Sequence, residues 1–113
     1  FPPDIEARQY IIDRQLLDVP SDNIDTTYLA QRTELFSGAD LAHLCQSAID
    51  VVFEESLESG NARPLNNNDF KLPLREVSPS TRSWFESARN YAMFANQSGS
   101  YDDLLNYIKK MKL

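Results

Sequence analysis

The residues best placed to do chemistry form a short run, Ser37-Gly38-Ala39-Asp40, at the start of a long segment with an apolar stripe. The Ser37 hydroxyl can accept a hydrogen bond from a backbone amide, and Asp40 three positions later can return the interaction in a variant of the capping box. Gly38 and Ala39 leave the first helical turn almost bare, so a flat ligand or another chain could lie against its backbone. The alternative is simply a well-capped helix, which these four residues alone favour.

The sole histidine and the sole cysteine lie two positions apart, at His43 and Cys45. This spacing puts them on different faces of a helix, whereas metal-ligand pairs on a helix need spacings of three or four. Cys45 is surrounded by apolar residues, as a small buried thiol is, and a hydrolytic triad would have to use His43 from an otherwise structural helix. We therefore expect no catalytic residue and no metal site in this chain.

The sequence contains no glycine-rich phosphate loop and no acidic pair at the end of a strand that could hold magnesium. The chain therefore cannot by itself organise nucleotide hydrolysis. Glu54, Glu55 and Glu58 form an acidic patch, and such a patch is most often the solvated face of a helix.

Composition restricts the possible partners. The formal net charge is -6 and the pI is near 4.6, which argues against nucleic acid as a partner because phosphate binding needs clustered Lys and Arg. No apolar run approaches the roughly 18 residues needed to span a bilayer, and no leader precedes the fold, so no membrane partner is expected. A single cysteine fits a reduced, cytoplasmic setting.

The elements that must position the Ser37–Asp40 run are predicted to be helices, because no stretch shows the two-residue alternation of a half-buried strand. We predict an all-α fold, a small bundle of five or six helices. The predicted helices cover about 4–17, 25–33, 37–59, a short segment after Asn66 that Pro73 should shorten or kink, 79–96, and a last helix that begins near Ser100.

Apolar residues at spacings of three and four predict the buried faces of these helices. In the third helix the stripe consists of Leu41, Leu44, Cys45, Ala48 and Val52. In the fifth helix, which Ser78 should cap, the expected core stripe consists of Trp84, Ala88, Tyr91 and Ala95, with Phe85 and Ala92 beside it. In the last helix Tyr101, Leu104, Leu105 and Ile108 form an apolar face that needs a partner surface.

The order and spacing of several motifs resemble the C-terminal lid, the small helical domain, of AAA ATPases. The motifs are Pro2-Pro3-Asp4-Ile5-Glu6-Ala7-Arg8, Leu29-Ala30-Gln31-Arg32-Thr33-Glu34, Phe36-Ser37-Gly38-Ala39-Asp40-Leu41, Leu44-Cys45-Gln46-Ser47-Ala48, Asn68-Asp69-Phe70 and Val77-Ser78-Pro79-Ser80. The resemblance covers roughly residues 2–85 and is greatest to the branch with the Cdc48, katanin and FtsH-like ATPases. The tail beyond Phe85 resembles that of bacterial members, so a bacterial source is expected.

The resemblance implies which residues meet the cofactor, ATP or ADP. In the family the lid closes over the nucleotide, and the positions that match Gly38 and Ala39 pack against the base and ribose. The position that matches Gln15, seven after the motif arginine Arg8, lies near the nucleotide in the family, and the one that matches Ile11 packs on the base. From the residues alone, Ile11 is equally well a core residue.

The resemblance also implies a longer parent protein, because Walker A, Walker B and the arginine fingers are absent here. Residues 1–77 would be the lid core, and 78–113 a C-terminal helical extension packed on it. The expected partners are the large ATPase domain of the same chain and the neighbouring subunit of a hexameric ring, and the isolated chain is expected to be a monomer. Leu35 departs from the Gly that commonly precedes the third helix, which removes an easy left-handed residue.

Two functions follow from these observations. The first is a lid that contributes to nucleotide binding, with Mg in the parent, and couples subunits in a protein-remodelling ATPase without being catalytic alone. The second is a free-standing acidic helical adaptor that binds a protein partner through the aromatic face around Trp84 and Tyr91 or through the last helix.

Overall fold

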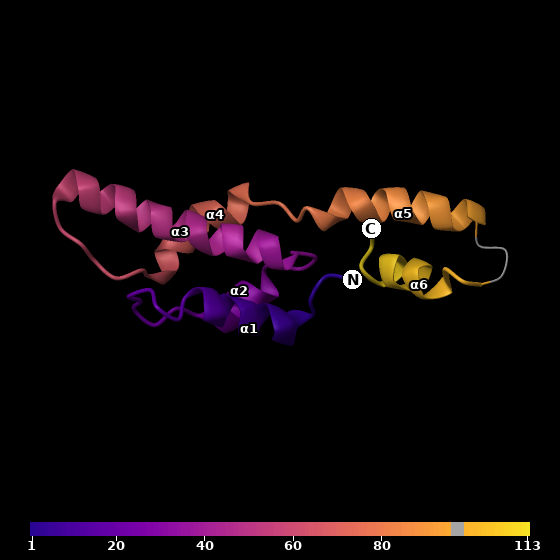
Figure 1. Ribbon diagram of the computed structural model, residues 1–113, viewed down its shortest axis with the longest axis horizontal. Helices are drawn as coiled ribbons and strands as arrows, with labels where there is room; N and C mark the ends of the chain where they lie inside the picture. The colour runs from indigo at the N-terminus through magenta and orange to yellow at the C-terminus, as the bar shows by residue number, and fades with distance from the viewer. Residues whose placement is uncertain (96–98) are drawn as a thin grey trace. The chain divides into compact units, whose positions relative to one another are not determined.

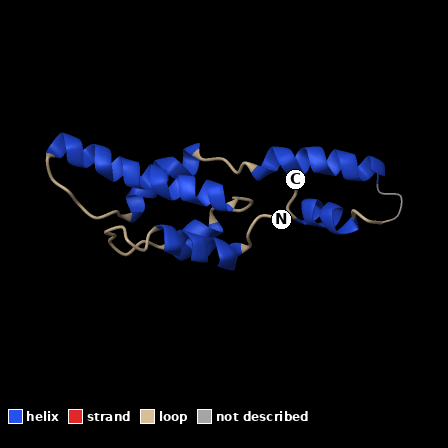
Figure 2. Cartoon of the chain, in the orientation of Figure 1, coloured by secondary structure: helices blue, strands red, loops and turns tan. Residues whose placement is uncertain are grey.

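The computed structural model describes residues 1–95 and 99–113, and the regular elements of this part of the chain are helices (Figures 1 and 2). In chain order they are α1 (Ile5–Gln15), α2 (Thr26–Gln31), α3 (Gly38–Ser59), the 3-10 helix η1 (Asn67–Phe70), α4 (Lys71–Glu76), α5 (Thr81–Ala95) and α6 (Asp102–Lys110). The described residues form no strand beyond an isolated bridge between Ser21 and Leu65. The predicted all-α fold is therefore confirmed.

Backbone contacts divide the chain into two compact units. Unit 1 comprises residues 1–79, with α1 to α4, and unit 2 comprises residues 80–113, with α5 and α6.

Four helix starts in unit 1 are capped by the side chain just before the helix. Asp4 accepts from the Ala7 amide at 2.8 Å, and Asp25 accepts from the Tyr28 amide at 3.0 Å. Ser37 and Asn66 cap α3 and η1 in the same way. Each cap satisfies amides that lack an intrahelical partner, which explains why the local sequence predicts these starts well.

The core of unit 1 is built around α3, which packs against α1, η1 and α4, while α1 also packs against α2. The buried cluster consists of Ile12, Leu16, Leu29, Phe36, Leu41, Leu44, Cys45, Ala48, Leu65 and Phe70. The stripe predicted for α3 is therefore buried, with Val52 partly buried beside it.

Two predicted helix bounds in unit 1 differ from the structure in an instructive way. The first helix ends at Gln15, with Leu16 as its C-cap, instead of at about Leu17; Leu16 is buried in the core and Leu17 is exposed. Pro73 lies in the first turn of α4, where a missing amide breaks no intrahelical bond. The segment after Asn66 is accordingly split into a 3-10 turn and a six-residue α-helix.

The predicted core stripe of α5 is wrong by about one residue around the helix. Phe85 and Ala92 are buried, whereas Trp84 is 59% and Tyr91 64% exposed. The reason is that, within unit 2, α5 packs against α6, which covers the face that carries Phe85. The Phe85 ring stacks on Tyr107 of α6 with 5.4 Å between the ring centroids.

The ends of the helices in unit 2 also differ from expectation. α5 begins at Thr81, so Ser78 does not cap it, and the predicted end at Asn96 lies outside the described residues. α6 begins at Asp102 after Tyr101, which makes no side-chain capping bond, instead of near Ser100. In the part of the chain that the structure describes, no helix has both the length and the apolar character that a membrane span requires.

Candidate functional site

The start of α3 is closed by a complete capping box. The Ser37 hydroxyl accepts from the Asp40 amide at 3.1 Å, and an Asp40 carboxylate oxygen accepts from the Ser37 amide at 2.9 Å. Ser37 itself is extended, with φ -75° and ψ 170°, as an N-cap residue should be. The reciprocal bonds fix both the position of the first turn and the direction from which the chain enters it.

The two small residues inside this box, Gly38 and Ala39, are exposed. A Cβ built on Gly38 would meet nothing within 4 Å, so the space outside the first turn is open. The first turn of α3 therefore presents bare backbone held by its own cap. A planar group could pack flat against such a surface, a contact that depends on shape and needs no charge.

The residue that leads into this helix start is strained. Leu35 has φ +69°, the left-handed conformation that glycine adopts easily and a leucine pays about 1 kcal/mol or more to hold. The structure therefore keeps the geometry of the usual glycine, with leucine in its place. The Leu35 side chain is only 3% exposed and the adjacent Phe36 is also buried, so burial offsets the strain and anchors the loop before Ser37.

The other two predicted site residues lie on α1. Ile11 and Gln15 are four positions apart and so share a face of that helix. Ile11 is partly buried against the core of unit 1, and Gln15 is exposed at the last position of α1. Since α1 packs against α3, both pairs of predicted residues lie on neighbouring helices of one unit. The hydrogen bonds of the described residues include none between the two pairs.

The motif arginine has a structural role that sequence reasoning did not predict. Arg8 is buried, and its Nε donates to the carbonyl oxygen of Ala30 at 3.0 Å while Nη1 donates to that of Pro3 at 3.1 Å. Ala30 lies near the end of α2, where free carbonyls attract a cation. Arg8 thus fastens α1 to α2 and to the segment before α1.

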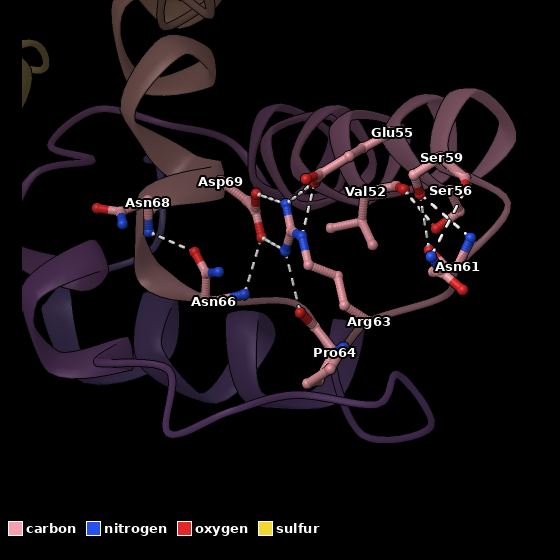
Figure 3. Close-up of polar contacts among 10 residues, drawn as sticks. All are labelled: Val52, Glu55, Ser56, Ser59, Asn61, Arg63, Pro64, Asn66, Asn68 and Asp69. Carbon is pink, nitrogen blue, oxygen red and sulfur yellow. Dashed lines mark hydrogen bonds and ion pairs between the residues drawn. The ribbon is translucent and has the colours of Figure 1, made fainter.

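A second arginine joins the far end of α3 to η1 (Figure 3). Arg63 makes two hydrogen bonds to the buried Asp69, at 2.7 and 2.9 Å, and Arg63 Nε donates to Glu55 at 2.6 Å. Asp69 also accepts from the Asn66 amide at 2.8 Å. The hydrogen bonds from Arg63 hold the pKa of Asp69 below its usual value. The sequence signals only the Asn66–Asp69 cap, because the partners of Arg63 become neighbours through folding.

The histidine and cysteine do not form a reactive pair. His43 is exposed on α3, and Cys45 is fully buried, so that burial raises the pKa of its thiol to about 11. Such a thiol is almost entirely protonated at neutral pH and is a poor nucleophile. Within residues 1–95 and 99–113, no group of three or more His, Cys, Asp or Glu side chains could hold a metal ion.

Comparison with known proteins places this site in context. Residues 23–70 match the family model described as the AAA+ lid domain. The chain is 38% identical to the meiotic spindle formation protein mei-1 of Caenorhabditis elegans over 92 aligned residues, which cover 69% of this chain and 20% of that protein. It thus spans about a fifth of the length of this relative. This relative and a second one, a putative cell division cycle ATPase of Plasmodium falciparum that is 35% identical over 79 residues (62% of this chain and 6% of that protein), are eukaryotic, and they do not support the expected bacterial source.

Two solved structures share the fold. One is a katanin structure, "Structural Basis for Katanin Self-Assembly", with TM-score 0.64, 35% identity, and coverage of 71% of this chain and 33% of that chain. The other is the FIGL-1 AAA domain in complex with ADP, with TM-score 0.66 and coverage of 81% of this chain and 35% of that chain; its 22% identity supports the fold alone. The order of the motifs, the capped start of α3 and the helical fold all agree with this family match. Residues 23–70 of this chain are therefore an AAA+ lid domain.

Proposed function

We propose that this chain is the C-terminal lid of an ATP-dependent AAA ATPase that remodels proteins, and that its bare α3 start packs against the bound nucleotide. The observation that carries the proposal is the exposed pair Gly38 and Ala39 inside a complete capping box. A planar base can lie against this turn without displacing a side chain. The similarity to the FIGL-1 AAA domain, whose structure contains ADP, supports nucleotide as the ligand in the parent protein.

In this proposal the lid supplies shape, and the rest of the parent supplies charge and chemistry. The Ser37–Asp40 run contains no cation that could neutralise a phosphate. Ile11 would pack on the base, and the Gln15 amide, which can both donate and accept, would hydrogen-bond the nucleotide. Most of the contacts to ATP or ADP, with Mg, would therefore come from other parts of the parent protein. This chain alone would bind the nucleotide only weakly.

The lid would also couple nucleotide state to movement between subunits. We propose residues 1–77 as the lid core and 78–113 as its helical extension, and unit boundaries near these positions support the division. The partners would be the large ATPase domain of the same chain and the neighbouring subunit of a cytoplasmic hexamer. The similarity to katanin, a protein that self-assembles, supports a ring. The packing of the extension on the lid stays a prediction.

The test is an Ala39→Trp substitution in the intact ATPase, with nucleotide affinity measured by equilibrium binding of fluorescent ADP. Because Ala39 is exposed, the larger side chain should not disturb folding, but it would occupy the space of the base. We expect affinity to fall by about tenfold or more, equivalent to about 1.4 kcal/mol of binding free energy. Ala62→Trp, at an exposed loop position, is the matched control. Unchanged affinity in Ala39→Trp would count against the proposed contact.

The exposed side of α5 favours a second candidate function, an acidic helical adaptor that binds a protein partner. Trp84 and Tyr91 protrude on one side of this helix, with the partly buried Ala88 and Ala95 between and beside them. Acrylamide quenching of Trp84 in the isolated chain should therefore be efficient. An adaptor role requires that this quenching persist in the full parent protein until a separate partner is added, whereas a lid extension would be protected within the parent itself.

A further inference from the structure

The basic side chains of unit 1 are few and unevenly placed. They are Arg8, Arg14, Arg32, Arg63, Lys71 and Arg75, in a unit with a large excess of acidic residues. Two of them are already bound inside the fold, since Arg8 is held by backbone carbonyls and Arg63 by Asp69 and Glu55. Of the remaining four, all except Arg14 line one pocket.

This pocket lies between α2 and the η1–α4 segment and has a volume of about 330 Å³. Its lining residues are Tyr28, Leu29, Arg32, Asn67, Asn68, Phe70, Lys71, Leu74 and Arg75. Leu29 and Phe70 belong to the buried core, so they form an apolar floor. Lys71 and Arg75 are four positions apart on α4 and so share a face of that helix, opposite Arg32 at the end of α2.

The three cations of the pocket are not neutralised by carboxylates. Among the described residues, no ion pair to a carboxylate is found for Arg32, Lys71 or Arg75, in contrast to Arg63. Arg32 instead donates to the Tyr28 hydroxyl at 2.6 Å and lies over the Tyr28 ring, at 5.6 Å from its centroid. The acid on α2's own N-cap, Asp25, is engaged with the Tyr28 amide. The pocket therefore keeps a net positive charge in a unit that is otherwise strongly acidic.

We infer that this pocket binds an acidic segment of a partner protein, with an apolar side chain on the floor and carboxylates on Arg32, Lys71 and Arg75. Charge complementarity carries the inference, because an acidic partner is repelled by most of this chain and attracted here, which fixes where it docks. The donors are side chains on helix surfaces, without the glycine-rich backbone that cradles phosphates. The volume lies at the lower end of the range for small-molecule sites and suits one or two side chains.

To test the inference, the 113-residue chain is immobilised and used to select binders from a phage-displayed library of random 12-residue peptides. We expect the enriched peptides to share an apolar residue flanked by Asp or Glu. The dissociation constant of the consensus peptide is then measured by fluorescence anisotropy. Each charge-assisted hydrogen bond that is lost should weaken binding by about tenfold or more, so Lys71→Gln and Arg75→Gln should each show a loss of that size.

Arg14→Gln is the matched control, because Arg14 is an exposed arginine near the end of α1 and does not line the pocket. It removes the same charge and should leave binding within about twofold. Because Lys71 and Arg75 are exposed, their neutral variants should fold, which circular dichroism and thermal unfolding check.

Several outcomes would overturn the inference. Enriched peptides without acidic residues, or equal affinity for the wild type and the Arg75→Gln variant, would show that the pocket does not read carboxylates. If millimolar pyrophosphate displaces the bound peptide and other anions do not, the pocket is a phosphate site instead. A dimer in sedimentation that Arg75→Gln dissolves would make a second copy the occupant.

Discussion

Unit 1 and unit 2 are both helical, but they differ in how much of their apolar surface they bury. In unit 1 the core is shared by α1, α2, α3, η1 and α4, and it includes the fully buried Phe70. Among the described residues of unit 2, those that are buried are Phe85, Ala92 and Ile108, while Phe94 is 90% exposed. The helix starts differ too, since α1, α2 and α3 have side-chain caps and α6 has none.

The difference shows which part of the chain carries its own stability. Several elements around one core bury each other's apolar faces, so unit 1 has the contacts of an independent domain. A two-helix unit of fewer than about 40 residues cannot bury enough surface and usually needs further contacts. The exposed Trp84 and Tyr91 are apolar surface that unit 2 does not bury by itself.

Truncation of one buried aromatic in each unit should separate the two most clearly. Phe70→Ala should lower the free energy of unfolding of unit 1 by about 3–5 kcal/mol because it removes a large buried side chain and opens a cavity in the core. Phe85→Ala removes most of the small core of unit 2 and should unfold α5 and α6 while unit 1 stays folded. Hydrogen exchange read by mass spectrometry reports each unit in the same experiment. If Phe85→Ala lowers protection in residues 1–79 as well, the units do not unfold separately.

The next largest effect should come from the ion pair that closes unit 1. Asp69→Asn leaves Arg63 with a weaker partner at a buried position and should cost about 2–3 kcal/mol at pH 7. The pKa of Asp69 is lowered in the folded state, so its stabilisation is fully present above the unfolded value of about 3.9 and is lost as pH falls through the lowered pKa.

Urea unfolding of the wild type and Asp69→Asn at pH 7 and near pH 2 measures this dependence. We expect the difference between the two proteins to shrink at the acidic pH, because Asp69 of the unfolded wild type is then protonated and this protonation favours unfolding. Glu55→Gln is the control, since Glu55 contacts Arg63 from an exposed position and should cost less than about 1 kcal/mol. A difference that stays constant with pH would remove the carboxylate charge as the cause.

A smaller effect should reverse the usual ranking of alanine and glycine. At Leu35, both substitutions lose the buried side chain, but only glycine relieves the strain of φ +69°. Leu35→Gly should therefore be more stable than Leu35→Ala by about 1 kcal/mol. At Leu44, buried inside α3, glycine should be less stable than alanine by about the same amount. Thermal unfolding of the four variants decides, and a Leu35 pair that ranks like the Leu44 pair contradicts the strain.

The smallest effect should come from the cap of α3. Ser37→Ala removes the acceptor for the Asp40 amide and should cost about 0.5–1 kcal/mol, with a midpoint shift in urea. Ser47→Ala, in the interior of the same helix, is the control and should be neutral or slightly stabilising. Equal stability of the two variants would mean that the capping box does not hold the helix start.

Features that depend on near neighbours in the sequence were predictable. The predicted helix starts near residues 4, 25 and 37 and after Asn66 were correct, because each start is capped by a side chain two or three positions before the amide that it binds. The buried stripe of α3 was correct because this helix is packed by several elements along one side. The nucleotide-facing roles of Gly38, Ala39, Ile11 and Gln15 stay predictions.

The predictions that were wrong concern features that depend on how other elements pack against a helix. The sequence of α5 contains two adjacent apolar stripes, and only the position of α6 decides that Phe85 is buried and Trp84 is not. The same limit applies to Arg63, whose pairing with Glu55 and Asp69 joins residues up to eight positions apart across a loop.

The sequence by itself determined the helical class, the helix starts of unit 1 and the order of the lid motifs, because these depend on capping, spacing and residue type along the chain. Only the tertiary structure decided which stripe of α5 is buried, that Arg8 holds α2, and that Arg32, Lys71 and Arg75 line one pocket. Which side chains are buried, and which charges lie next to one another, depends on contacts between distant segments, and these contacts exist only once the chain has folded.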